Sequence, residues 1–207
     1  MRIGLTCEAG RAPAEVLDLL DAAGLSTDLL REQRAPALLA QPAGAWLLGT
    51  SGDVLRACDR GALDVGVVGS DGLLEGRSGV ADLLDLGRCR DELVLAMMPG
   101  GGRPDRRPRI ATRYPQTTSR HFAAAGAQPD ILVLDEPSLA PALGLADGVV
   151  ELRSRLAAGL AGMPPLEVGE VVADCSAHLV AARAARVLLR DEIGALVTSL
   201  RAALEKR

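Results

Sequence analysis

An alternation of strands and helices that stops and then restarts is the feature that most restricts how this chain can fold. Short apolar runs at residues 2–6, 46–49 and 64–68 are separated by amphipathic segments. The segment 99–108 is rich in Gly, Pro and Arg and predicts an exposed loop. The alternation resumes at residue 109. This pattern predicts an α/β protein with mostly parallel sheets.

The interruption also predicts two lobes. Residues 1–91 plus 175–207 are expected to form lobe one, and residues 92–174 to form an inserted lobe two. In such α/β proteins a ligand binds in a cleft or at the carboxyl ends of parallel strands. We therefore expect a ligand cleft between the lobes or at their strand ends.

Four further segments have predicted conformations. Residues 80–84 and 139–143 read as short helical pieces, and residues 186–204 as a strongly periodic terminal helix. Residues 156–165 are expected to be irregular, because Pro164-Pro165 cannot lie inside a continuous helix.

Composition excludes several functions. The only lysine is Lys206, so a Schiff-base lysine, a phosphate-loop lysine and a catalytic lysine base are all excluded. With one Trp, one Tyr and one Phe, the chain lacks a base-stacking platform, and a net charge of -4 opposes binding to a phosphate backbone. Nucleic acid is therefore not an expected partner.

Cysteine spacing and hydropathy predict a cytoplasmic protein without a membrane segment. The cysteines at positions 7, 58, 89 and 175 are scattered, with no CxxC pair, and are read as buried thiols rather than metal ligands. The N-terminus has no apolar signal region, and no apolar run approaches a bilayer span. An exported solute-binding protein is accordingly disfavoured.

Three turns that follow strands carry candidate chemistry. In the first, residues 7–11, Arg11 could clamp an anion, although the segment also suits a simple polar turn. In the second, residues 49–53, small residues open a helix whose amides could receive phosphate, although Ser and Thr there are usually caps. In the third, residues 112–118, hydroxyls, a guanidinium and helix amides combine. No nucleophile–base constellation is present in the sequence.

Five segments resemble ATP phosphoribosyltransferases in order and spacing. They are residues 64–71 (DVGVVGSD), 82–87 (DLLDLG), 109–115 (RIATRYP), 139–150 (LAPALGLADGVV) and 176–183 (SAHLVAAR, similar to the family's SSARLIANR). The length resembles the family's short form, which works with a regulatory subunit similar to histidyl-tRNA synthetase.

The resemblance implies two lobes like those of a type II periplasmic binding protein, with ATP and phosphoribosyl pyrophosphate meeting in the cleft. The family joins N1 of the ATP adenine to C1 of the ribose and expels pyrophosphate with Mg²⁺ present, which opens histidine biosynthesis. It also implies a homo-oligomer. Such a displacement depends on positioning and on stabilising the leaving pyrophosphate more than on a nucleophilic side chain.

This sequence departs from the family's pattern in four places. The motif PKGRL is replaced by residues 7–12 (CEAGRA) without its lysine, and GFGxCRL is reduced to residues 87–93 (GRCRDEL). The glutamate of ELAP aligns with Ser138, and Glu136 lies two positions earlier. The phosphate loop DxVxTGxTL aligns with residues 151–159 (ELRSRLAAG), which lack both threonines and the internal glycine.

Two explanations of the altered loop remain open. In one, Arg153 and Arg155 replace the lost donors with guanidinium charge, and phosphate still binds. In the other, the chain is a diverged non-catalytic paralogue that acts as a regulatory subunit or binds another small anionic ligand. The two arginines could also be solvated surface charges.

The resemblance and the strand-end positions together give the candidate residues. Arg11 and Arg113 would neutralise phosphates, the hydroxyls of Thr117 and Thr118 would donate hydrogen bonds, and Asp147 would contact the ribose or the magnesium shell. The full candidate set is Arg11, Asp53 and Asp71 in lobe one, and Arg113, Thr117, Thr118, Asp147, Arg153 and Arg155 in lobe two. Asp147 and Arg113 are expected to be catalytic, and the others to bind substrate.

Overall fold

The computed structural model describes residues 1–7, 11–41, 44–76, 79–100, 107–159 and 166–206. The chain divides into two compact units. Unit 1 comprises Met1–Leu73, Arg77–Arg90 and Ser176–Arg207, and unit 2 comprises Leu74–Gly76 and Asp91–Cys175. Among the described residues, no helix is long and apolar enough to cross a membrane.

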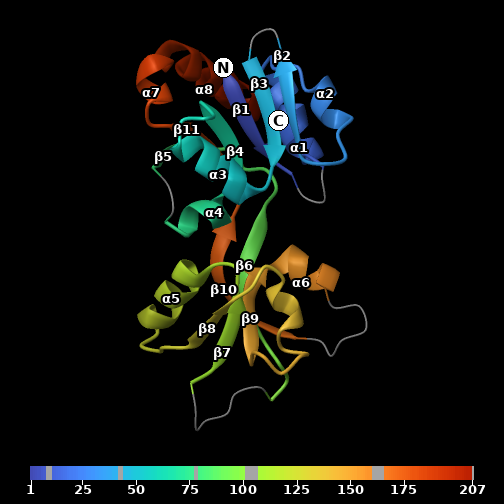
Figure 1. The fold of residues 1–207 in the computed structure, drawn as a ribbon, viewed down its shortest axis with the longest axis vertical. Coiled ribbons are helices and arrows are strands. Elements are labelled where there is room, and N and C mark those ends of the chain that lie inside the picture. Colours follow the sequence, from blue (N-terminus) through green and yellow to red (C-terminus); the bar gives the residue numbers. More distant parts are fainter. Residues whose placement is uncertain (8–10, 42–43, 77–78, 101–106, 160–165, 207) are drawn as a thin grey trace. The chain divides into compact units, whose positions relative to one another are not determined.

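Unit 1 is built on a six-stranded sheet with parallel strands at its centre (Figure 1). β1 pairs in parallel with β3 and β4, so their carboxyl ends meet at one edge. β2, β11 and β5 add antiparallel pairs on the flanks. In spatial order the strands are β2 (Ala37–Gln41), β3 (Gly44–Gly49), β1 (Arg2–Thr6), β4 (Val65–Gly69), β11 (Ala177–Ala182) and β5 (Val80–Asp85).

Helices cover both faces of this sheet. α1 (Ala14–Ala22) and α8 (Arg190–Glu205) pack on one face in a single apolar cluster, and α3 (Ser51–Asp59) packs on the other. Gly4 and Gly66 allow α3 to lie close, because a Cβ on either would come within 2.6 Å or 2.7 Å of Val54 Cγ1. The remaining helices are α2 (Asp28–Arg31), α4 (Ser70–Leu74) and α7 (Ala185–Leu188).

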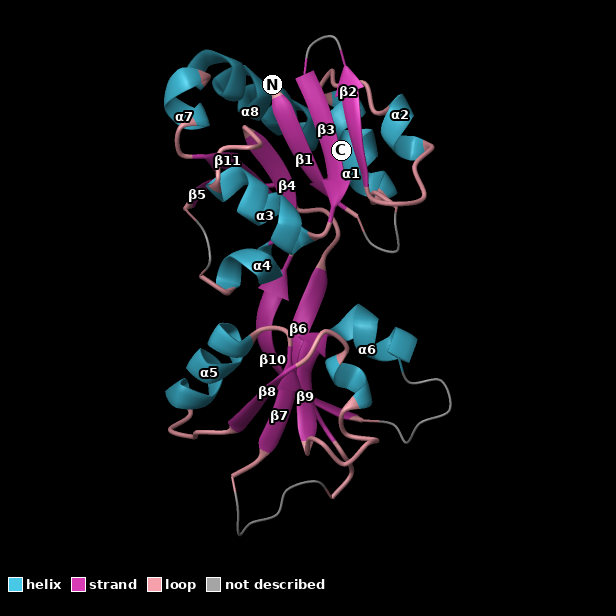
Figure 2. Cartoon of the chain, viewed as in Figure 1, coloured by secondary structure: helices cyan, strands magenta, loops and turns pink. Residues whose placement is uncertain are grey.

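Unit 2 contains a five-stranded mixed sheet with a helix layer on each face (Figure 2). α5 (Pro115–Ala124) covers one face through Phe122, while α6 (Arg153–Gly159) and the 3-10 turn η1 (Pro137–Leu139) cover the other through Leu156 and Ala140. In spatial order the strands are β10 (Glu167–Cys175), β6 (Asp91–Met97), β9 (Gly148–Leu152), β7 (Arg109–Thr112) and β8 (Asp130–Val133).

The α/β class and the two sheets agree with the sequence prediction, but the sheets are mixed rather than mostly parallel. Parallel pairing is confined to β1 with β3 and β4, and to β7 with β8 and β9. Residues 80–84, expected to be helical, form β5 instead. A short segment cannot offset the cost of nucleating a helix, and the edge of β11 offers it backbone partners.

The other differences have local causes. Residues 139–143 do not form an α-helix: Leu139 ends η1 and residues 140–143 form turns, because Pro141 has no amide proton. The segment expected to be irregular, residues 156–165, begins inside a helix, because α6 spans residues 153–159. Pro164-Pro165 and most of the expected loop at 99–108 lie outside the described residues. The terminal helix breaks at Leu189 between α7 and α8, and the sequence prediction missed α2 and β2.

Candidate functional site

In unit 1, small hydroxyl side chains gather where the parallel strands end. Thr6 Oγ1, at the end of β1, lies 3.1 Å from Ser51 Oγ in the first turn of α3 and donates to the carbonyl of Val67 at 3.1 Å. The amide of Gly69, at the end of β4, donates to Ser51 Oγ at 3.4 Å. The ends of β1 and β4 therefore both contact the hydroxyl of Ser51, which follows the end of β3.

The two predicted acidic residues of unit 1 flank this point. Asp53 accepts from Thr50 Oγ1 at 2.7 Å and from Arg56 Nη1 at 3.0 Å, so it closes the first turn of α3. Asp71, in the first turn of α4, lies against Gly69, where a Cβ would come within 2.1 Å of its Oδ1. A Cβ at Gly69 would therefore require the carboxylate of Asp71 to rotate away.

Arginines in unit 1 are exposed or half-buried. Arg11 is exposed. It ends the expected anion-binding turn at residues 7–11, of which residues 8–10 lie outside the described residues. A depression of about 500 Å³ is lined by Glu15, Gly87, Arg88 and Arg90. It lies beside the amide of Cys89, which donates to Glu15 Oε2 at 3.2 Å.

In unit 2, the carboxyl ends of β7 and β9 hold an ion-pair cluster. Arg113 Nε lies 3.2 Å from Glu151 Oε2, and Arg113 Nη2 donates to Glu136 Oε1 at 2.7 Å. Arg155 Nη2 lies 3.9 Å from the same oxygen of Glu136. The side chain of Glu151 is only 2% exposed, whereas that of Glu136 is 65% exposed. Two arginines therefore share one exposed carboxylate above a buried one.

The first turn of α6 is likewise matched by carboxylates. Arg153 Nε donates to Glu92 Oε2 at 2.6 Å. Ser154 Oγ donates to Asp91 Oδ2 at 2.5 Å, and the Ser154 amide donates to Asp91 Oδ1 at 3.4 Å. The donors that stand where the family's phosphate loop would lie are therefore paired with acidic residues at the start of β6.

At the start of α5, the predicted hydroxyls face inward. Thr118 is fully buried and its hydroxyl donates to Thr112 Oγ1 at 3.3 Å. The amides of Gln116 and Thr117 donate to the buried carboxylate of Glu75 at 3.1 Å and 2.8 Å. Glu75 thus occupies the amides that were expected to receive an external anion.

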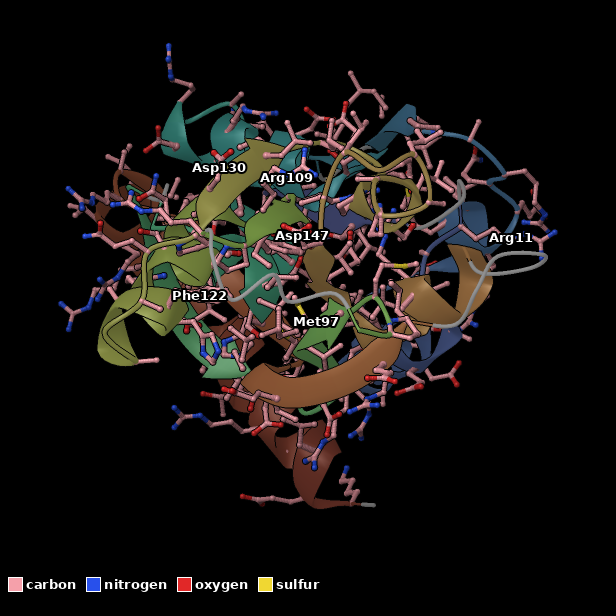
Figure 3. The ribbon with its side chains drawn as sticks, turned by 90° about the horizontal axis from the view of Figure 1, so that it is seen from below. Arg11, Met97, Arg109, Phe122, Asp130 and Asp147 are labelled. Atoms are coloured by element: carbon pink, nitrogen blue, oxygen red, sulfur yellow. The ribbon has the colours of Figure 1, made fainter. Side chains whose placement is uncertain are left out.

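Asp147 lies at the opposite edge of the unit 2 sheet from Arg113, because it precedes β9 whereas Arg113 follows the parallel strand β7. Its carboxylate accepts from the Arg109 amide at 2.8 Å, its own amide donates to the Arg109 carbonyl at 2.8 Å, and Arg109 Nη2 donates to the Gly144 carbonyl at 3.0 Å. Figure 3 shows Arg109 and Asp147 together at this end. The structure therefore does not bring the two residues predicted to be catalytic together.

Unit 1 repeats this arrangement. Asp64 precedes β4, accepts from the Arg2 amide at 2.6 Å and donates its own amide to the Arg2 carbonyl at 2.9 Å. Arg2 Nη2 donates to the Gly61 carbonyl at 2.9 Å. We call each arrangement a clasp: an Asp before one strand holds the Arg that begins its parallel neighbour. The repetition indicates that Asp147 fastens strands.

The comparisons with known proteins agree with the motifs. Residues 50–202 match the ATP phosphoribosyltransferase family. The chain is 37% identical over 200 residues to an ATP phosphoribosyltransferase from Sorangium cellulosum, with 94% of this chain and 92% of that protein covered. The chain belongs to the ATP phosphoribosyltransferase family.

Solved structures show the same fold. The ATP phosphoribosyl transferase (HisG:HisZ) complex from Thermotoga maritima matches with a TM-score of 0.79 at 23% identity, and all of both chains is covered. The periplasmic aliphatic sulphonate binding protein from Escherichia coli matches with a TM-score of 0.55 at 14% identity, over 99% of this chain and 72% of that one. The expected likeness to periplasmic binding proteins is therefore confirmed for the fold.

ATP phosphoribosyltransferases act with a divalent metal, so the carboxylates of this chain are candidate metal ligands. Within the described ranges, no group of three or more His, Cys, Asp or Glu side chains is arranged to hold a metal by itself. Magnesium is usually bound by one or two carboxylates together with substrate phosphates. The residues present therefore fit a metal that arrives with a phosphorylated substrate, and Asp71 is a carboxylate that follows the end of β4.

The thiols and histidines of the described chain have structural surroundings. All four cysteines carry thiols, three of them buried, and burial raises the pKa of Cys58 to about 12. His121 Nε2 lies 3.2 Å from Glu170, and His178 Nδ1 lies 3.0 Å from Asp82. The pKa of Asp85, next to His178, is lowered, because hydrogen bonds from Gly87 and Ser176 outweigh the rise that burial would cause.

The sequence interpretation missed the acidic residues that pair with the arginines. One signal was available: Glu151 interrupts the otherwise apolar run of β9, and a charge inside a buried strand needs a partner. Glu75, Asp91, Glu92 and Glu136 carry no comparable signal, because each lies at or next to the end of a secondary-structure element, where acidic residues are common. Only the fold shows which donor each of them meets.

Proposed function

We propose that this chain transfers the phosphoribosyl group of phosphoribosyl pyrophosphate to N1 of the ATP adenine. N1 attacks C1 of the ribose, the bond from C1 to the pyrophosphate oxygen breaks, and pyrophosphate leaves. The supporting observation is family membership, with relatives aligned over nearly the whole chain, combined with polar clusters at the strand ends of both units.

In this proposal, unit 2 holds the 5′-phosphate through guanidinium groups. Arg113 and Arg155 stand together at the ends of β7 and β9, where arginine can form paired hydrogen bonds to phosphate oxygens. Arg153 contributes positive charge at the start of α6, beside Glu92. Thr117, Thr118 and Asp147 support this unit through the internal contacts described above.

Unit 1 contributes the remaining contacts in the proposal. Asp53, Asp71 and the Ser51 hydroxyl stand at the ends of parallel strands, where α/β proteins bind ligands. Arg11 would neutralise the leaving pyrophosphate, and oriented positive charge on a leaving group lowers the barrier to its departure. No side chain is required to form a covalent intermediate.

Magnesium is the metal we propose, and Asp71 is its protein ligand alongside the substrate phosphates. When bound, it would neutralise charge on the pyrophosphate as that group leaves. The chain's own part is to present one carboxylate at the edge of the sheet.

We further propose that the protein is a cytoplasmic homo-oligomer that works with a regulatory subunit similar to histidyl-tRNA synthetase. The similar structure from Thermotoga maritima is a complex of HisG with HisZ, which supports a second subunit. The four thiols suit a reducing compartment.

A rate measurement tests the proposed function. The protein is incubated with ATP, phosphoribosyl pyrophosphate and Mg²⁺, with and without the regulatory subunit, and pyrophosphate release is followed. Turnover that requires both substrates supports the proposal. Absence of turnover, with no rise in Tm on adding phosphoribosyl pyrophosphate under either condition, would contradict it.

A second candidate, a non-catalytic paralogue, is favoured by one observation. Asp91 and Glu92 already pair with the donors of α6 in the place of the family's phosphate loop. Such a chain would bind the regulatory subunit without turnover, so the same measurement separates the two functions.

A further inference from the structure

Glu136 differs from the other acidic residues of the unit 2 cluster in how loosely it is held. Glu151 is 2% exposed and also accepts from the amide of Leu152 at 2.9 Å, so it is fixed to the strand. Glu136 is 65% exposed, stands on the turn before η1, and contacts the cluster through one oxygen. Its carboxylate can move into water at little cost.

The single Glu136 oxygen occupies the place where two guanidinium groups converge. It lies 2.7 Å from Arg113 Nη2 and 3.9 Å from Arg155 Nη2. Without it, the cluster would contain two arginines and only the buried Glu151, leaving one uncompensated positive charge. Like charges held close together are costly, so this position favours an anion at all times.

We propose that Glu136 is an internal anion that closes the Arg113–Arg155 pair until a substrate phosphate displaces it. This inference rests on the proposed function, because it concerns the phosphate subsite of that reaction. A phosphate monoester carries more negative charge than a carboxylate and offers three acceptor oxygens to the two planar donors. Glu136 thereby sets how much charge a ligand needs to enter this subsite.

Displacement of Glu136 would make the altered phosphate loop select phosphate monoesters over monocarboxylates. Glu151 stays beside Arg113 when Glu136 leaves, so the opened subsite keeps one negative and two positive side chains. A ligand with one carboxylate would replace the charge of Glu136 with an equal charge. A phosphate monoester brings more negative charge and more hydrogen-bond acceptors than Glu136, and therefore displaces it.

Binding of inorganic phosphate and ribose 5-phosphate, measured by isothermal titration calorimetry at fixed ionic strength, tests the inference. Glu136→Gln keeps the size of the side chain and removes its charge. We expect both ligands to bind about three- to tenfold more tightly to this variant than to the wild type, the range that loss of a competing exposed ion pair allows. The matched control is Glu170→Gln, which removes an exposed carboxylate paired with His121 in the same unit and should leave affinity unchanged.

A second variant fixes the location of the effect. Adding Arg155→Gln to Glu136→Gln should abolish the gain. Equal affinities for the wild type and Glu136→Gln, weaker binding by Glu136→Gln, or a gain that survives Arg155→Gln would each overturn the inference. Glu136→Ala repeats the test if the glutamine variant fails to fold. Because the binding measurement needs neither ATP nor turnover, a failed activity assay would contradict the proposed function and leave this result standing.

Discussion

The two units bury polar groups very differently. Among the described residues, unit 2, the smaller unit, contains six of the eight buried polar or charged residues, including Glu75 and Glu151. Unit 1 contains the other two, Thr27 and Asp64. At its strand ends unit 1 presents hydroxyls and amides that bond to one another, whereas unit 2 presents arginines that are each matched by a carboxylate.

The difference shows where the chain has diverged. The segment that lost the family's threonines and glycine lies in unit 2, and the same region now carries internal ion pairs. Buried or half-buried charges are stable only with partners, so arginines entering this region require acidic neighbours. The clasps Arg2–Asp64 and Arg109–Asp147, in contrast, are alike in both units.

The largest effect is expected at Arg113. Arg113→Met leaves the buried Glu151 without its guanidinium partner, which should lower the free energy of unfolding by about 3–5 kcal/mol. It should also reduce kcat/KM about a hundredfold or more in the native state. Urea unfolding and initial rates measure the two effects. Arg201→Met, on an exposed position of α8, is the control. A fully active Arg113→Met would show that the Arg113 cluster of unit 2 does not bind substrate.

The clasps give the next largest effect. Asp64→Asn and Asp147→Asn should each lower the free energy of unfolding by about 1–3 kcal/mol, because each weakens contacts to an arginine at the start of a strand. Under native conditions kcat/KM should stay within about twofold for both. If Asp147→Asn lost activity while keeping its stability, Asp147 would contact the ligand and the likeness of the two units would fail.

The stability of unit 1 in acid should depend on Asp64. Burial would raise the pKa of Asp64, but hydrogen bonds from Arg2 outweigh it and the pKa is lowered. The unfolded carboxyl titrates near pH 3.9, so the stabilisation is complete above that pH and is lost as the pH falls through the lower folded value.

Unfolding of the wild type and Asp64→Asn at pH 3 to 7 measures this loss. The difference in unfolding free energy, about 1–3 kcal/mol at pH 7, should shrink below about pH 4. A difference that stayed constant down to pH 3 would show that Asp64 acts through packing.

The smallest effect is expected at the hydroxyls of unit 1. Ser51→Ala removes the hydroxyl that contacts Thr6 Oγ1 and accepts from the Gly69 amide. Thr6 keeps its hydrogen bond to the Val67 carbonyl. We expect less than about 1 kcal/mol in stability and about a two- to fivefold rise in KM. Ser199→Ala, exposed on α8, is the control. A hundredfold loss of activity would show that unit 1 dominates the chemistry.

Much of the fold was predictable because it depends on local pattern. The apolar runs at residues 2–6 and 64–68 became the central strands β1 and β4, and the terminal helix expected at residues 186–204 formed with one break, as α7 and α8. Residues 80–84 were misread because a six-residue strand at a sheet edge has no periodicity that separates it from a helix.

The sequence by itself determined the α/β class, the family and the positions of Arg113, Arg153 and Arg155 after strands, since these follow from periodicity and motif order. Only the tertiary structure decided that Asp147 and Arg113 stand at opposite edges of one sheet, and that Glu136 and Glu151 face Arg113. The reason is that strand order and register bring together residues far apart in the chain. A carboxylate's partner is set by that pairing and leaves no mark in the local sequence.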